Sequence, residues 1–108
     1  MDQDEKRKKL VNFLNKKLFD PILEKSKDDY DSEALKRRLE EMQQSTKREK
    51  ERFRQYDTPE EVRENYLNDL SSDAAEDVNE ELKELDLPRL PQFKKEFLDL
   101  CKELDVTS

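Results

Sequence analysis

The side chains that perform most protein chemistry are scarce in this chain of 108 residues. The sequence contains no histidine, no glycine and a single cysteine. Without histidine, Ser-His-Asp and Cys-His catalytic arrangements and His-ligated zinc are unavailable. Without glycine, phosphate-binding loops are excluded, and we expect no turn that requires a positive φ angle. The sequence therefore predicts a protein that is not an enzyme, has no small-molecule substrate and binds no metal or cofactor.

The single thiol, Cys101, follows Phe97 by one helical turn. It cannot form an internal disulfide, which suits a reducing compartment. A buried cysteine behaves as a small hydrophobic residue, and no neighbour in the sequence would lower its pKa. We therefore expect Cys101 to pack in the core and the protein to be cytoplasmic.

Carboxylates are abundant, and they are concentrated in one segment. Residues 57–88 hold 12 acidic and 2 basic side chains, whereas residues 32–56 hold 5 acidic and 8 basic ones. A rigid surface of carboxylates can imitate a phosphate backbone and occupy the basic groove of a nucleic-acid-binding protein. Acidic helices also simply keep small proteins dispersed, so both interpretations stay open. The acidic surface comprises Glu60, Glu61, Glu64, Asp73, Glu76, Asp77, Glu80, Glu81 and Glu84.

The basic run at residues 47–54 raises the question of nucleic-acid binding. A face that binds a duplex presents an unbroken basic stripe to the phosphates. On a helix, these basic side chains spread over more than half the circumference, and Glu40 and Glu51 fall among them. Phe53 and Tyr56 fall on the opposite side. We therefore expect a solvated face with salt bridges and no nucleic-acid partner. If helix 57–70 folds back onto the basic helix, its carboxylates would neutralise the basic run from within the chain.

Apolar residues at three- and four-residue spacings predict the helices that position these groups. The first helix is expected at residues 4–19, with an interruption at Asp20-Pro21, a short segment after it and a loop at residues 26–32. Ser32 or Asp31 is expected to cap a long helix that extends to residue 56.

Three more helices are expected in the second half of the chain. Thr58 is predicted to cap the first of them, with Pro59 in its first turn. Ser71 and Ser72 are predicted to cap the second. The prolines in residues 86–91 end that helix, and a third follows them.

The long helix carries a seam with the heptad spacing of coiled coils. Two polar residues, Thr46 and Glu49, interrupt it, and there a partner could complete the packing or a second copy could set its register. Aromatic residues at its end are typical interface anchors. The candidate partner-binding residues are Met42, Thr46, Glu49, Phe53 and Tyr56.

Together these patterns predict an all-α fold: one domain, residues 1–108, with fraying at residues 1–5 and 105–108. We expect a bundle of about five helices, in which a long N-terminal hairpin packs with three shorter helices. The first 19 residues lack a continuous apolar stretch, so neither a signal peptide nor membrane binding is expected. The expected function is a protein-protein interaction module that binds another protein or a second copy through apolar helix faces. The alternative is an acidic DNA mimic that binds a basic protein.

Overall fold

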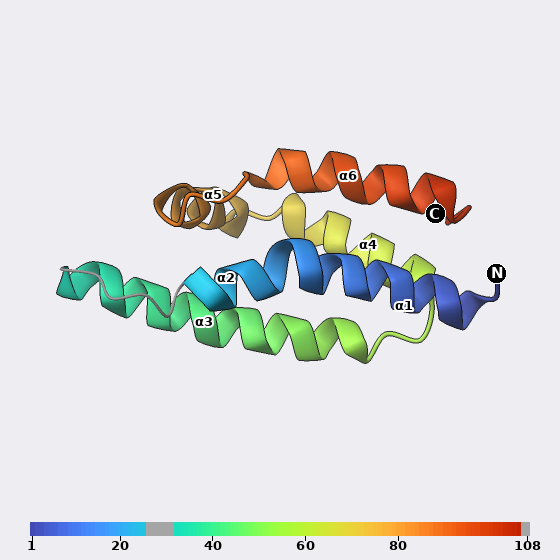
Figure 1. Ribbon diagram of the computed structural model, residues 1–108, viewed down its shortest axis with the longest axis horizontal. Coiled ribbons are helices and arrows are strands. Elements are labelled where there is room, and N and C mark those ends of the chain that lie inside the picture. Colours follow the sequence, from blue (N-terminus) through green and yellow to red (C-terminus); the bar gives the residue numbers. More distant parts are fainter. Residues whose placement is uncertain (26–31, 107–108) are drawn as a thin grey trace.

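The computed structural model describes residues 1–25 and 32–106 (Figure 1). Every regular element in these ranges is helical, as the sequence predicts. The elements are α1 (Gln3–Leu14), a π-helical turn η1 (Asn15–Phe19), α2 (Asp20–Lys25), α3 (Glu33–Arg54), α4 (Pro59–Leu70), α5 (Ala74–Glu84) and α6 (Leu90–Glu103). The expected all-α bundle is therefore confirmed.

Four of the helical stretches run along the long axis of the molecule, which measures 47 × 22 × 20 Å. The first three elements form one continuous rod that lies beside α3, while α4 and α6 pack on its other side (Figure 1). Helix α5 does not follow the long axis; it crosses one end of the bundle and is seen end-on in that view. This is the predicted helical hairpin with three shorter helices. The expected connecting loop, at residues 26–31, lies outside the described residues.

The predicted interruption at Asp20-Pro21 is wrong. Asp20 has helical angles, φ −65° and ψ −41°, and its N–H donates to the carbonyl of Asn15, five residues back. In a regular α-helix the ring of Pro21 would clash with the carbonyl four residues earlier. The wider π-helical turn just before the proline changes that spacing, and the rod continues without a break.

The predicted caps of α3 and α4 are confirmed. The hydroxyl of Ser32 accepts a hydrogen bond from the N–H of Leu35 at 3.3 Å. That of Thr58 accepts one from the N–H of Glu61 at 3.2 Å, with Pro59 in the first turn. Each bond satisfies one of the N–H groups that lack a partner at a helix start.

The predicted caps of α5 are wrong. Asp73 precedes this helix, and its side chain makes no capping bond. The hydroxyls of Ser71 and Ser72 instead donate to the carbonyls of Leu67 at 3.2 Å and Asp69 at 2.7 Å. They therefore satisfy the end of α4 rather than the beginning of α5.

Two turns with positive φ contradict the expectation drawn from the absence of glycine. Asp86 and Asp105 both have φ 57°. Each follows a helix, and the next residue's N–H donates back into that helix, from Leu87 to Leu82 at 2.9 Å and from Val106 to Cys101 at 2.8 Å. Aspartate is one of the few residues that tolerate the left-handed region, so it replaces glycine in this C-terminal cap.

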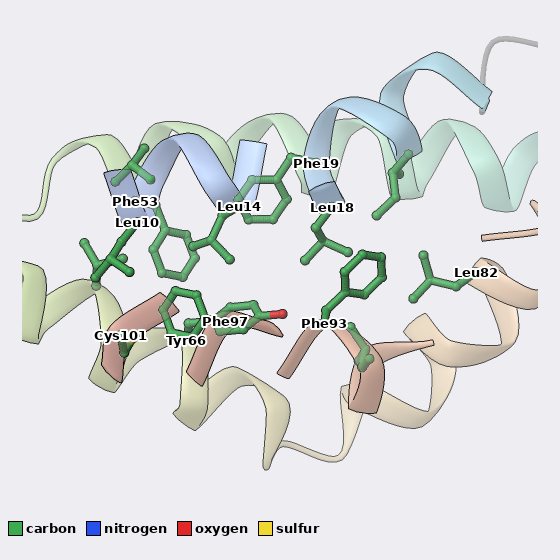
Figure 2. Packing of buried hydrophobic residues seen from close by; sticks show 14 of the residues in the cluster. Leu10, Leu14, Leu18, Phe19, Phe53, Tyr66, Leu82, Phe93, Phe97 and Cys101 are labelled. Atoms are coloured by element: carbon green, nitrogen blue, oxygen red, sulfur yellow. The ribbon is translucent and has the colours of Figure 1, made fainter. Parts of the chain in front are cut away.

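The core runs along the rod (Figure 2). Its labelled members are Leu10, Leu14, Leu18, Phe19, Phe53, Tyr66, Leu82, Phe93, Phe97 and Cys101. The apolar seam residues of α3 belong to this core or pack against it: Leu35, Leu39, Met42, Phe53 and Tyr56. Fraying at residues 1–5 and 105–108 stays a prediction; α1 begins at Gln3, and Val106 is 2% exposed. Residues 107 and 108 lie outside the described part.

Candidate functional site

A groove with an apolar floor lies between α3 and α5. It consists of two adjoining hollows of about 340 and 310 Å³. The groove exists because α3 and α5 make little direct contact with each other. The residues that line both hollows are Leu18, Phe19, Ser45, Glu49, Ala74 and Val78.

Core side chains form the floor of the groove. Leu18 and Phe19, on the π-helical turn, are each 6% exposed and line both hollows. The Phe19 ring lies 5.9 Å from that of Phe53, which in turn lies 6.4 Å from that of Tyr66. These contacts tie the floor to α3 and α4, so its shape is set by the packed core.

An ion-pair network closes one end of the groove. Arg52 on α3 donates to the carboxylate of Glu49 at 2.5 Å and also contacts that of Asp69 on α4. Its guanidinium lies 4.9 Å from the centre of the Phe53 ring. Burial alone would lower the pKa of Arg52, but the two carboxylates raise it. Helix α4 packs mainly against α1 rather than along the basic helix, but the Arg52–Asp69 pair counters the basic run within the chain at this point.

Glu49 is the polar seam residue that faces the groove. It is half-buried, and burial raises the pKa of its carboxyl. The nearby Arg52 lowers that pKa, whereas the neighbouring Asp69 carboxylate raises it further. The protein therefore holds a partly desolvated charge on the groove wall and compensates it with a single shared guanidinium.

Carboxylates also mark the other end of the groove. Glu41 on α3 and Asp77 and Glu81 on α5 line the second hollow. No ion pair joins any of the three to a described residue. Burial raises the pKa of Glu81; Arg38 lowers it, and Asp77, Glu84 and Glu41 raise it further. Like charges therefore face one another across this part of the groove.

The structure distributes the five predicted partner-binding residues as follows. Met42, Thr46 and Phe53 are buried in the chain's own core, with 7%, 6% and 1% exposure, and line the hollows from beneath. Glu49 lies on the wall. Tyr56 is half-buried, lies outside the groove, and packs edge-on against Phe53 at 5.4 Å. Their role in binding a partner stays a prediction.

The predicted acidic surface is divided between two helices. Glu60, Glu61 and Glu64 lie on α4, whereas Asp73, Glu76, Asp77, Glu80, Glu81 and Glu84 lie on or just before α5. Asp77 and Glu81 line the groove, and Glu84 pairs with Arg38 of α3 at 3.2 Å. Sequence reasoning did not single out Glu41, Ser45 or Ala74 as site residues. No local pattern marks them, because the groove forms only where α3 meets α5.

Two buried groups outside the ion-pair network have unusual surroundings. Burial raises the pKa of the Cys101 thiol to about 11, although Arg63 opposes the shift, so the thiol packs as the sequence predicts. Tyr66 is 3% exposed, and burial raises the pKa of its hydroxyl. This hydroxyl has no hydrogen-bond partner among the described residues.

Within residues 1–25 and 32–106, no cluster of three or more potential ligands could hold a metal ion. None of the described helices has both the length and the apolar character needed to cross a membrane. Comparisons with protein-family models, curated proteins and solved structures found no match to this chain. Its function must therefore be inferred from the groove and the charges around it.

Proposed function

We propose that this protein is a non-catalytic interaction module, acting as an adaptor, regulatory subunit or inhibitor, that binds another protein through the groove between α3 and α5. The observation that carries the proposal is the apolar floor, where Leu18 and Phe19 of the core line a hollow on the surface. Proteins bind partner side chains in such concave, mainly apolar sites. The volume of each hollow lies at the lower end of the range for ligand sites.

The polar interruption of the α3 seam supports the same location. Thr46 and Glu49 lie where a continuous apolar seam would otherwise pack against another helix, and both line the groove. Polar residues at such positions commonly select the register and identity of a partner. Binding would then complete the packing that the chain's own helices leave open at this point.

A photo-crosslinking amino acid placed at Ser45 tests this proposal in a lysate of the source cells. Ser45 is exposed and lines both hollows. We expect adducts from this position and none from the same group at Lys47, which is exposed on the same helix but does not line the groove.

The variant Ala74→Trp provides the matching block. Ala74 is exposed and lines both hollows, so a tryptophan there would occupy the space without replacing a core residue. We expect it to abolish the adducts from Ser45, whereas Gln92→Trp on the exposed face of α6 should leave them unchanged. Equal adducts at Ser45 and Lys47, or adducts that survive Ala74→Trp, would contradict the proposal. An adduct at twice the mass of the chain would identify a second copy as the occupant.

The acidic surface supports a second candidate, an acidic DNA mimic that occupies a basic groove of a nucleic-acid-binding protein. Glu64, Glu76 and Glu80 are exposed, and none has an ion-pair partner in the part of the chain that the structure describes. For this function, partners retained on immobilised protein should elute at moderate salt. The Glu76→Lys/Glu80→Lys variant should no longer retain these partners, whereas the Ala74→Trp variant should still retain them. The opposite pattern would exclude mimicry.

A further inference from the structure

The groove has a pronounced charge asymmetry. Its charged lining residues are Glu41, Glu49, Asp69, Asp77 and Glu81. All five are carboxylates, and no lysine or arginine lines either hollow among the described residues. The asymmetry does not simply follow composition, because α3 itself is rich in lysine and arginine. Those basic side chains line neither hollow, although Arg52 reaches the carboxylates of Glu49 and Asp69 at one end.

The two ends of the groove differ in how their charges are compensated. Arg52 pairs with both Glu49 and Asp69 at one end. At the other end, Glu41 on one bank and Asp77 and Glu81 on the opposite bank have no ion-pair partner among the described residues. Carboxylates that face one another across an apolar hollow repel, and a cation placed between them would relieve that repulsion.

The spacing of these carboxylates matches a helical occupant. Glu41 and Glu49 are about 12 Å apart along α3, at 1.5 Å per residue, and Asp77 and Glu81 are about one turn apart on α5. The α3 bank is therefore negative over about two helical turns and the α5 bank over about one. The banks are helices and the described residues form no sheet edge, so an added strand would find no backbone to pair with.

We infer that the groove takes an amphipathic basic helix of another protein. Its apolar side chains, at three- and four-residue spacings, enter the hollows over Leu18 and Phe19. Its lysine or arginine side chains lie beside Glu41, Asp77 and Glu81. This inference rests on the proposed function and specifies the chemistry of the partner. The net charge of the chain, −7, favours the approach of such a helix over longer distances.

A designed peptide serves as the probe. It has about 18 residues, enough to form a helix, with leucine on one face and lysine on both flanks. A second peptide keeps the leucines and replaces every lysine with glutamate. Binding of each fluorescently labelled peptide is measured by anisotropy as the protein is titrated. We expect the lysine peptide to bind, its affinity to fall as salt is added, and the glutamate peptide not to bind.

Two variants with the same change in net charge separate groove binding from general attraction. The groove variant is Glu41→Gln/Asp77→Asn/Glu81→Gln. The matched control is Glu64→Gln/Glu76→Gln/Glu80→Gln, whose exposed side chains do not line the groove. We expect the groove variant to weaken lysine-peptide binding roughly tenfold and the control to leave it nearly unchanged. Circular dichroism confirms that both variants keep the fold.

Each other outcome overturns the inference in a different way. If both variants weaken lysine-peptide binding equally, the peptide is attracted by the overall charge of the protein and not by the groove. If the lysine peptide does not bind at all, the groove does not take a basic helix. Equal binding of the two peptides, lost in Ala74→Trp, would show an apolar groove without preference for charge and would leave the proposed function intact. A dimer in sedimentation analysis that Ala74→Trp dissociates would make a second copy the occupant. The proposed function itself is tested separately, by the crosslinks from Ser45 with their Lys47 and Ala74→Trp controls.

Discussion

Replacing Tyr66 with phenylalanine should stabilise this protein. The Tyr66 ring packs edge-on against Phe97 at 4.7 Å and Phe53 at 6.4 Å, and phenylalanine keeps both contacts. The hydroxyl is lost, but it is buried and has no hydrogen-bond partner among the described residues. The substitution therefore removes a desolvated polar group and leaves the apolar packing unchanged.

A buried polar group without a partner costs about 1–3 kcal/mol. Tyr66 also lines the first hollow of the groove, so the lower value applies, and Tyr66→Phe should raise the free energy of unfolding by about 1 kcal/mol. For a domain of this size, that corresponds to an increase in Tm of about 4 °C. Thermal and urea unfolding at pH 7 measure both quantities.

The gain should grow in alkaline solution. Burial raises the pKa of Tyr66 in the folded protein, whereas in the unfolded chain the tyrosine ionises near pH 10. The wild-type fold therefore loses stability as the pH rises above about 10, because only the unfolded state gains from releasing the proton. Tyr66→Phe abolishes this loss, so its advantage should be larger at pH 11 than at pH 7 by about 1.4 kcal/mol.

Tyr56→Phe is the matched control. Tyr56 is half-buried, and its hydroxyl is not among the buried groups that lack a partner. Its removal should change the free energy of unfolding by less than about 0.5 kcal/mol. If Tyr66→Phe instead destabilises the protein by 1 kcal/mol or more, on the scale of a lost hydrogen bond, the Tyr66 hydroxyl has a partner such as an ordered water, and the reasoning is refuted.

Three further substitutions test other features of the fold and the groove. Asp105→Gly should raise the free energy of unfolding by about 0.5–1 kcal/mol in urea denaturation, because Asp105 has φ 57° and glycine adopts that region without strain. A decrease in that free energy would mean that the Asp105 side chain stabilises the turn. Val106→Asp should lower the Tm and cost more than about 1.5 kcal/mol, since Val106 is 2% exposed; an unchanged Tm would instead indicate fraying at the C-terminus. Glu81→Gln should stabilise by about 0.2–1 kcal/mol at pH 7 but not near pH 4. Burial and nearby carboxylates raise the pKa of Glu81, so its charged form is disfavoured in the fold, and this penalty disappears once the carboxyl is protonated in both states; an equal gain at both pH values would exclude this explanation.

Much of the fold followed from local sequence patterns, because local interactions determine it. The seam of α3 could be predicted from residue spacing, since an α-helix returns to the same face every three to four residues. The caps at Ser32 and Thr58 could be predicted because a hydroxyl needs only its own helix to find an N–H partner. The caps predicted at Ser71 and Ser72 were wrong, because the same hydroxyls can bond to the carbonyls of the preceding helix instead.

The sequence by itself determined that the chain is helical, which faces of the helices are apolar, and that most negative charge follows residue 56. Tertiary structure decided which of these faces stayed partly uncovered. Glu41 and Glu81 belong to different helices, and only the packing of α3, α5 and the π-helical turn places them on opposite banks of one groove. Tertiary packing also determined that Arg52 pairs with Asp69, so that a carboxylate of the same chain neutralises part of the basic run. Contacts between distant segments depend on how whole helices pack, and no spacing along the sequence encodes them.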